Sequence, residues 1–405
     1  MNAICLVVDR LHLGYLGAYG NTWIETPQFD RLASQGFLFD QFVIDSPHLE
    51  FLCRSYWQGV HALARAEAGQ ERAPLPSLLG VRGVTTALVT DEPAVADHPL
   101  ASAFDRRLEI DALPVTEPAP TMEETHLARC FAEMIEWLRD APEPFFLWCH
   151  LMGLGAAWDA PLERRRAYAD EDDPPPPESV TVPNRLLEPD CDPDEVLGIS
   201  QAYAGQVSLL DTCLGALAKA LEASRAGRET LLVLVGARGF PLGEHRRVGA
   251  CDNALYGELV RAPLVMGFPG RLGAAARSQA LVEPADLWAT ILDWFEVADA
   301  PASLTGRSLL PVVRGDLEAL RDRLCIMGHD ASRAGLTPFW YLRKTDALEL
   351  FVHPDDFWQV NNVSDRCPEV AGMMEAMISQ YFQAVQSNQS PYSSPLPETL
   401  RVEAD

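Results

Sequence analysis

The stretch AICLVVDRLHLGYLGAY, residues 3–19, decides the fold. Its first half is a continuous apolar run, which is the pattern of a parallel strand buried on both faces. Asp9 stands where this strand would end. In an open α/β sheet the carboxyl ends of the strands line the ligand crevice, so Asp9 is a candidate metal ligand or catalytic group. The alternative is that Asp9 only caps the turn that follows.

Two later segments repeat this pattern of a buried run that ends in polar residues. PFFLWCH, residues 144–150, ends on His150, and TLLVLVGARGFPLG, residues 230–243, leads into Glu244 and His245. Three strands that deliver polar groups to one edge have the layout of a single active site.

Further motifs relate the chain to a known family. VVDRLHLGYLGAYGNTWIETPQFDRLASQGFLFD, residues 7–40, resembles the N-terminal signature of the sulfatase family, within the alkaline-phosphatase-like superfamily. The resemblance continues in chain order through PFFLWCHLM, SLLDTCLGALAKALE, GEHRRVGACDNALYGELVRAPLVM and ELFVHPDDFWQVNNVSD. It implies an α/β fold with a mostly parallel central sheet flanked by helices, and a small C-terminal antiparallel subdomain.

Length, composition and charge limit the classes of protein and partner. The chain has 405 residues, which favours a large domain and a smaller one. With 48% hydrophobic and 22% charged residues it has an ordinary globular composition. A net charge of −26 disfavours nucleic acid and anionic membrane surfaces as partners. No stretch of sequence approaches the roughly 18 apolar residues of a membrane span.

Cysteine usage and the N-terminus bear on the compartment. The nine cysteines are odd in number and have no paired spacing such as CxxC, which is typical of buried thiols in a reducing compartment. The first strand begins by residue 3, which leaves no room for a secretory leader. We therefore expect a cytoplasmic protein, although many sulfatases that this chain resembles are exported.

Patterning along the chain predicts its organisation. We expect an α/β domain over residues 1–318, an α+β subdomain over 319–387 and a flexible or partner-held tail over 388–405. Residues 160–193, rich in Arg, Asp and Pro, are expected to form an exposed excursion. Apolar spacing and end signals predict helices after Thr26, with Pro27 first and Gly36 as the stop, and over residues 123–139, 197–223, 284–295 and 368–385.

The resemblance implies a metal site that this chain carries only in part. Sulfatases bind a calcium-type ion through two acids after the first strand and through an Asp with a His or Asn after a later strand. Asp9 matches the first acid, but Arg10 stands at the second. Where the family has SDHG or TDHG, this chain has GARG, so Ala237 and Arg238 replace the other pair. A dication beside two guanidinium groups, with one carboxylate to neutralise it, is strongly disfavoured.

The nucleophile motif is altered as well. The family nucleophile is a formylglycine, made from Cys or Ser in a CxPSR motif. With Arg54 aligned to the motif arginine, Glu50 stands at the nucleophile and Cys53 at the motif serine. Cys53 is the thiol nearest to this position and could therefore be the reactive group. The alternative is a half-buried structural cysteine, because a thiol reacts only in an activating environment.

This chain also has fewer of the groups that bind sulfate in the family. The motif HLMDPH becomes HLMGLG, which keeps His150 and has Gly155 in place of the second histidine. GEH keeps His245, but Ala250 stands where a lysine is expected. His150 and His245 are candidate catalytic residues, and hydrogen-bonded framework histidines are the alternative.

These replacements act on one reaction. The metal ion, the nucleophile and the cationic groups each accelerate such a reaction by a factor of roughly 10² or more. Their joint loss therefore argues against the ester hydrolysis that the family catalyses. We expect no bound cofactor. We also predict that Arg10 or Arg238 lies over Asp9 and takes the electrostatic place of the ion, because an unpaired buried carboxylate is costly.

The sequence therefore favours a sulfatase-like pseudoenzyme that acts as a binding or structural subunit, with an unknown protein partner or a second copy of itself. Two alternatives remain open. One is a sulfate or phosphate ester hydrolase with an unusual catalytic set, Asp9, Glu50, His150 and His245. The other is a small-anion-binding protein that uses an arginine cluster, Arg10, Arg54 and Arg238.

Overall fold

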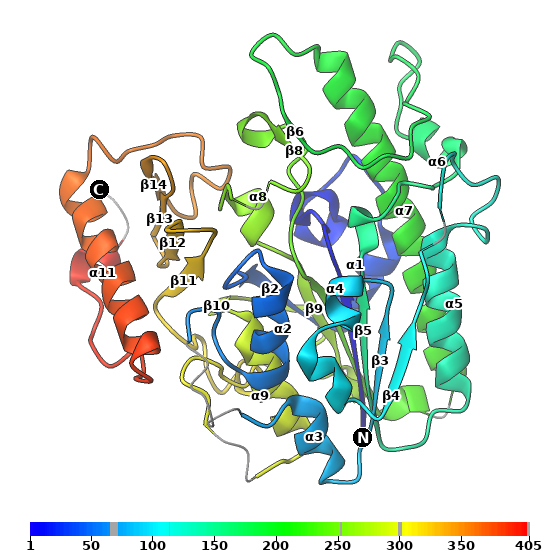
Figure 1. The fold of residues 1–405 in the computed structure, drawn as a ribbon, viewed down its shortest axis with the longest axis horizontal. Coiled ribbons are helices and arrows are strands. Elements are labelled where there is room, and N and C mark those ends of the chain that lie inside the picture. The colour runs from blue at the N-terminus through cyan, green and yellow to red at the C-terminus, as the bar shows by residue number, and fades with distance from the viewer. Residues whose placement is uncertain (65–71, 113, 225, 252, 299–301, 403–405) are drawn as a thin grey trace.

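An eight-stranded sheet forms the centre of the protein in the computed structural model, which describes residues 1–64, 72–112, 114–224, 226–251, 253–298 and 302–402 (Figure 1). Across the sheet the strands are, in order, β10 (Ala276–Val282), β2 (Phe37–Phe42), β9 (Leu264–Gly267), β7 (Thr230–Gly236), β1 (Asn2–Val8), β5 (Phe145–Leu151), β3 (Thr85–Thr90) and β4 (Arg106–Glu109).

Most neighbouring strands run parallel. β1 lies between β5 and β7 and pairs in parallel with both, while β9 pairs antiparallel with β2 and β7. Every residue of β1 is buried, as the apolar run at the start of the chain predicts. The predicted mostly parallel α/β sheet is confirmed. Its central position brings the carboxyl end of β1 between those of β5 and β7.

Helices cover both faces of this sheet and enclose two separate cores. One face packs against α2 (Leu49–Gln58), α3 (Leu75–Gly80), α4 (Pro93–Ala96), α8 (Gly257–Val260), α9 (Pro284–Trp294) and α10 (Leu310–Val313). The other packs against α1 (Pro27–Gln35), α5 (His126–Arg139) and α7 (Pro193–Ala223), with α6 (Leu162–Arg166) beside α7.

The helix predictions agree with the structure apart from their ends. α1 begins at Pro27 with Thr26 as its N-cap residue, and Gly36 ends it, as predicted. α7 begins at Pro193, several residues before the predicted start, because Asp192 caps it through a side-chain bond to the Asp194 N–H.

The C-terminal part is a four-stranded antiparallel sheet covered by a helix, which confirms the predicted small subdomain. It lies to one side of the large sheet in Figure 1. Its elements are β11 (Leu324–Met327), β12 (Arg333–Leu336), β13 (Trp340–Lys344), β14 (Leu348–Val352) and α11 (Pro368–Gln386). The buried ion pair between Arg321 and Asp286, with Nη1 to Oδ2 at 2.6 Å, joins the segment before β11 to α9.

Segments expected to be loop or tail are partly ordered against the chain. The excursion contains α6 and β6 (Arg185–Leu186), which pairs with β8 (Arg247–Val248), and Arg165 in α6 is fully buried. In the tail, the side chains of Leu396 and Leu400 are buried in the C-terminal core. These two side chains therefore contact their own chain, and residues 403–405 lie outside the described residues. Within the described part of the chain, no helix has both the length and the hydrophobicity to cross a bilayer.

Candidate functional site

Four of the predicted residues come together at the carboxyl edge of the central strands. Asp9 follows β1, His150 is near the end of β5, and Arg238 follows β7. The parallel register places Val7 beside His150 and Val8 beside Gly236. We call Asp9, Arg10, His150 and Arg238 the Asp9 site.

Arg238 binds both oxygens of Asp9. Its Nε donates to Asp9 Oδ1 at 2.9 Å, its Nη2 donates to Oδ2, and its Nη1 donates to the Pro47 carbonyl at 3.1 Å. Burial alone would raise the pKa of Asp9, but the charge and hydrogen bonds of Arg238, assisted by Arg10, outweigh it and lower that pKa. A bidentate pair of this kind fixes both side chains. The prediction that a guanidinium lies over Asp9 is confirmed.

Arg10 fills the space beside this pair. Its Nε lies 3.8 Å from Asp9 Oδ2, and its backbone has a positive φ of 60°. The Tyr203 hydroxyl holds that backbone by donating to the Arg10 carbonyl at 2.6 Å. A Cβ atom at Gly155 would lie 3.0 Å from Arg10 Cγ. The arginine therefore occupies room that a side chain at position 155 would need.

The donor set at this edge does not fit the calcium ion of the family. Calcium takes about 6–8 oxygen ligands, most of them from anionic or carbonyl groups. Here both Asp9 oxygens accept hydrogen bonds from a guanidinium, Arg10 adds a second positive charge, and Ala237 supplies only a buried methyl group. An ion at this place would have to displace Arg238 and would then face two cations and one carboxylate.

The residues of the altered nucleophile motif differ in their environments. All three lie on α2, where Cys53 is fully buried in the core, Glu50 is exposed in the first turn, and Arg54 donates from Nη2 to the Ala64 carbonyl at 3.1 Å. Burial raises the pKa of the Cys53 thiol, which keeps it protonated and unreactive. The structural interpretation of Cys53 fits this environment, with full rather than partial burial.

His150 is buried beside Asp9 without a fixed hydrogen-bonding role. Neither ring nitrogen has a partner among the described residues. Burial lowers the pKa of His150 to about 4, and the charge of Arg238 acts in the same direction while that of Asp9 opposes it. The ring is therefore neutral near pH 7. The expected hydrogen-bonded framework role does not describe this histidine.

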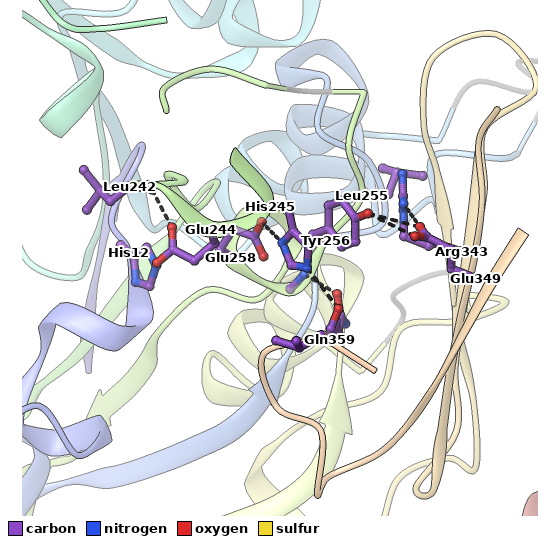
Figure 2. Close-up of polar contacts among 12 residues, drawn as sticks. His12, Leu242, Glu244, His245, Leu255, Tyr256, Glu258, Arg343, Glu349 and Gln359 are labelled. Carbon is purple, nitrogen blue, oxygen red and sulfur yellow. Dashed lines mark hydrogen bonds and ion pairs between the residues drawn. The ribbon is translucent and has the colours of Figure 1, made fainter. Parts of the chain in front are cut away.

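His245, by contrast, lies in a hydrogen-bonded network that reaches the C-terminal subdomain (Figure 2). Its Nδ1 is 2.8 Å from Glu258 Oε1, and its Nε2 is 3.0 Å from the Gln359 carbonyl oxygen. The ring centroids of His245 and Tyr256 are 3.5 Å apart, and the two rings are stacked. The guanidinium carbon of Arg343 lies 3.8 Å from the centroid of the Tyr256 ring. His245 thus acts as a framework residue between α8 and the loop after β14.

Sequence reasoning missed the partners in this network. Glu244, next to His245, accepts from the Leu242 N–H at 2.6 Å and lies 3.2 Å from His12 Nε2. Tyr256 donates to Glu349 Oε2 at 3.1 Å. The GEH motif indicates that position 245 is special, but no local pattern identifies partners from β14 and the loop that follows it.

The His245 contacts predict a pH-dependent contribution to stability. Burial lowers its pKa, but Glu258 and the Gln359 carbonyl outweigh burial and raise it. A raised pKa stabilises the fold below about pH 6.5, the unfolded value, and the contribution is lost as pH rises through the folded value. The free energies of unfolding of wild type and His245→Gln, measured from pH 6 to 9, should therefore converge as pH rises. The change in their difference should be no more than about 1 kcal/mol. A difference in the free energy of unfolding that stays constant from pH 6 to 9 would contradict a raised pKa of His245.

Two cavities are lined by none of the residues of the Asp9 site. One, of about 880 Å³, is lined by residues that include Thr85, Asp105 and Trp137, near the amino ends of β3 and β4. No predicted site residue lines it. The other, of about 10 Å³, is lined by residues that include His12 and Trp358. Its volume is close to that of one water molecule.

Comparisons with known proteins agree with this architecture. The family model described as Sulfatase matches residues 1–297. Iduronate 2-sulfatase of Mus musculus is 24% identical over 388 residues, which cover 78% of this chain and 68% of that protein. The multifunctional alkaline phosphatase superfamily protein PehA of Trinickia caryophylli is 31% identical over 122 residues, 30% of this chain but only 23% of that protein.

The fold of a solved structure is also similar. The phosphonate monoester hydrolase of Agrobacterium radiobacter has a TM-score of 0.76 at 17% identity, covering 100% of this chain and 99% of that one. At this identity the likeness establishes the fold alone. The family match over residues 1–297 shows that this protein belongs to the sulfatase family, within the alkaline-phosphatase-like superfamily.

Proposed function

We propose that this chain is a catalytically inactive member of the sulfatase family that serves as a binding or structural subunit. The bidentate contact of Arg238 with Asp9 carries the proposal, because it places a fixed cation on the carboxylate that would otherwise bind the metal. Arg238 also donates to the Pro47 carbonyl, so the guanidinium has a third anchor and is not free to swing away without loss.

The nucleophile position supports the same proposal. Cys53 is enclosed in the core, and Glu50 points outward from the first turn of α2. Activated nucleophiles need an adjacent base or a lowered pKa, and the pKa of the Cys53 thiol is instead raised by burial. The scaffold keeps its strands and loses the groups that would act on an ester.

Hydrolysis of a sulfate, phosphate or phosphonate ester is the second candidate. The activities named for the relatives favour it, and Asp9 and the neutral His150 lie together at the expected edge. Its weakness is the rest of the proposed catalytic set. Glu50 is exposed on α2, while His245 is hydrogen-bonded within the framework.

Anion binding by arginines has partial support. Arg10 and Arg238 carry two positive charges and Asp9 carries one negative charge, so positive charge exceeds negative charge by one at this site. Arg54 instead contacts the Ala64 backbone. A cytoplasmic location remains part of the proposal and is supported by the nine cysteines, six of them buried.

Calcium analysis and turnover assays on the purified chain test these candidates. We expect no stoichiometric calcium, and no difference between wild type and Asp9→Asn in turnover of an aryl sulfate, an aryl phosphate or an aryl phosphonate monoester. Turnover that requires Asp9 would contradict the inactive assignment. Sulfate or phosphate that stabilises wild type but not Arg10→Ala would favour anion binding.

A further inference from the structure

Three buried side chains form a second cluster, between the end of β3 and α5. Asp91 follows β3, while His126 and Cys130 lie one turn apart on α5 and face the same direction. Asp91 Oδ2 is 2.7 Å from His126 Nε2 and 3.7 Å from Cys130 Sγ, and Cys130 Sγ is 3.6 Å from His126 Nε2. All three residues are at least nine-tenths buried.

Asp91 does not cap α4, the helix that follows it. Glu92 takes that role, because its side chain accepts from the Ala94 N–H at the start of α4. Asp91 instead accepts from the Met152 N–H at 2.8 Å and directs its other oxygen toward α5. The carboxylate therefore joins α5 to the loop after β5.

Two of the three separations between the donor atoms are close to those of a metal site. In a zinc site with bonds of about 2.0–2.3 Å and near-tetrahedral angles, neighbouring ligand atoms lie roughly 3.3–3.6 Å apart. The contacts of Cys130, at 3.6 and 3.7 Å, lie at the upper limit of this range, and the Asp91 to His126 contact, at 2.7 Å, needs to open by at least about 0.6 Å. Thiolate, imidazole and carboxylate are also the ligands that zinc takes in proteins.

Charge balance favours a dication at this place. With a neutral His126 ring, Asp91 carries a buried charge that no cation in the cluster balances; with a charged ring, the His126 Nδ1 proton has no acceptor among the described residues. A divalent ion bound to one carboxylate, one thiolate and a neutral imidazole gives a cluster with no net charge. Buried charges are retained when they are paired or bind metals.

We propose that Asp91, His126 and Cys130 bind one Zn²⁺ ion, in a structural site that fixes α5 to the end of β3. The fourth position is left for a water molecule or for Cys149, which lies beside Val89 on the neighbouring strand. Through Met152, the site also steadies the 3-10 turn Gly153–Gly155, which contacts Asp9 and Arg10. The site is distinct from the family metal position, since its three residues come from the end of β3 and from α5 and include none of the Asp9 site.

Metal analysis of the full chain, produced in zinc-supplemented medium, tests the proposal. We expect about one zinc per chain. After removal by a chelator, Co²⁺ should restore one equivalent and produce a sulfur-to-cobalt charge-transfer band with intense d–d bands, which report a four-coordinate thiolate site. Folded wild-type protein that binds neither ion stoichiometrically would overturn the proposal.

Variants identify the ligands. Cys130→Ala should abolish the charge-transfer band, and His126→Gln should weaken zinc binding by more than the roughly 10–100-fold that loss of an outer partner costs. Cys5→Ala is the matched control, because Cys5 is equally buried but belongs to the opposite core. Retention of the band in folded Cys130→Ala, or equal loss in Cys5→Ala, would contradict the assignment. Circular dichroism establishes folding, and the wild-type titration decides the matter if a variant does not fold.

Discussion

Arg238→Ala should lower the free energy of unfolding by about 3–5 kcal/mol, which is the cost of removing one partner from a buried ion pair. The loss is large because Asp9 would remain buried with its charge, while Arg10 lies at 3.8 Å and makes a weaker contact. Urea denaturation near pH 7.5 measures it. Because the pKa of Asp9 is lowered in the fold, the contribution is present above about pH 4, the unfolded value, and is lost as pH falls through the folded value.

Arg54→Ala is the matched control for this loss. It removes a guanidinium from the same region, but one whose hydrogen bond goes to the neutral Ala64 carbonyl, so a cost of about 1 kcal/mol is expected. A double-mutant cycle of Arg238→Ala with Asp9→Asn isolates the pair, since the second substitution removes the charge that the first leaves unpaired. Equal losses in Arg238→Ala and Arg54→Ala would contradict the importance of the pair.

Much of the fold could be predicted because its signals are local. The apolar run before Asp9 identifies a strand buried on both faces, and Pro27 and Gly36 mark the two ends of a helix. β12 was not predicted. Its sequence, RAGL, is short and contains Gly335, whose missing side chain leaves room for Ile378 of α11. Such a strand is defined by its neighbours in the sheet and by the helix above it.

The candidate site was predictable only where charge alone decides the outcome. Asp9 with two arginines beside the expected metal position allows few arrangements, so the ion pair could be foreseen. The mutual fit of Arg10 and Gly155 depends on a loop contact between distant segments. The zinc cluster is harder still. The spacing of His126 and Cys130 is visible on one helix, but Asp91 is 35 residues away from His126 and meets it only through the sheet.

Restoring the family ligands should create calcium binding that the wild-type chain lacks. The variant Arg10→Asp, Ala237→Asp, Arg238→Asn replaces two cations with oxygen donors and adds a third carboxylate beside Asp9. Position 237 is adjacent to this edge, because the Ala237 N–H donates to the Val8 carbonyl at 3.0 Å. Position 10 has a positive φ, which Asp adopts more readily than Arg. The geometry of the strands therefore still suits the ligand set.

The expected readout is a calcium-dependent rise in stability. If the variant binds with a Kd of about 0.1 mM, 10 mM Ca²⁺ should stabilise it by about 2.7 kcal/mol, and wild type should not respond. Without calcium the variant should be less stable than wild type, because three carboxylates then repel one another. Arg10→Asp, Arg238→Asn without the change at Ala237 is the control and should bind more weakly. A folded triple variant that ignores calcium would mean that more than these side chains excludes the ion. Even with calcium bound the variant should not cleave aryl sulfates, since Cys53 remains buried in the core and Glu50 remains exposed on α2.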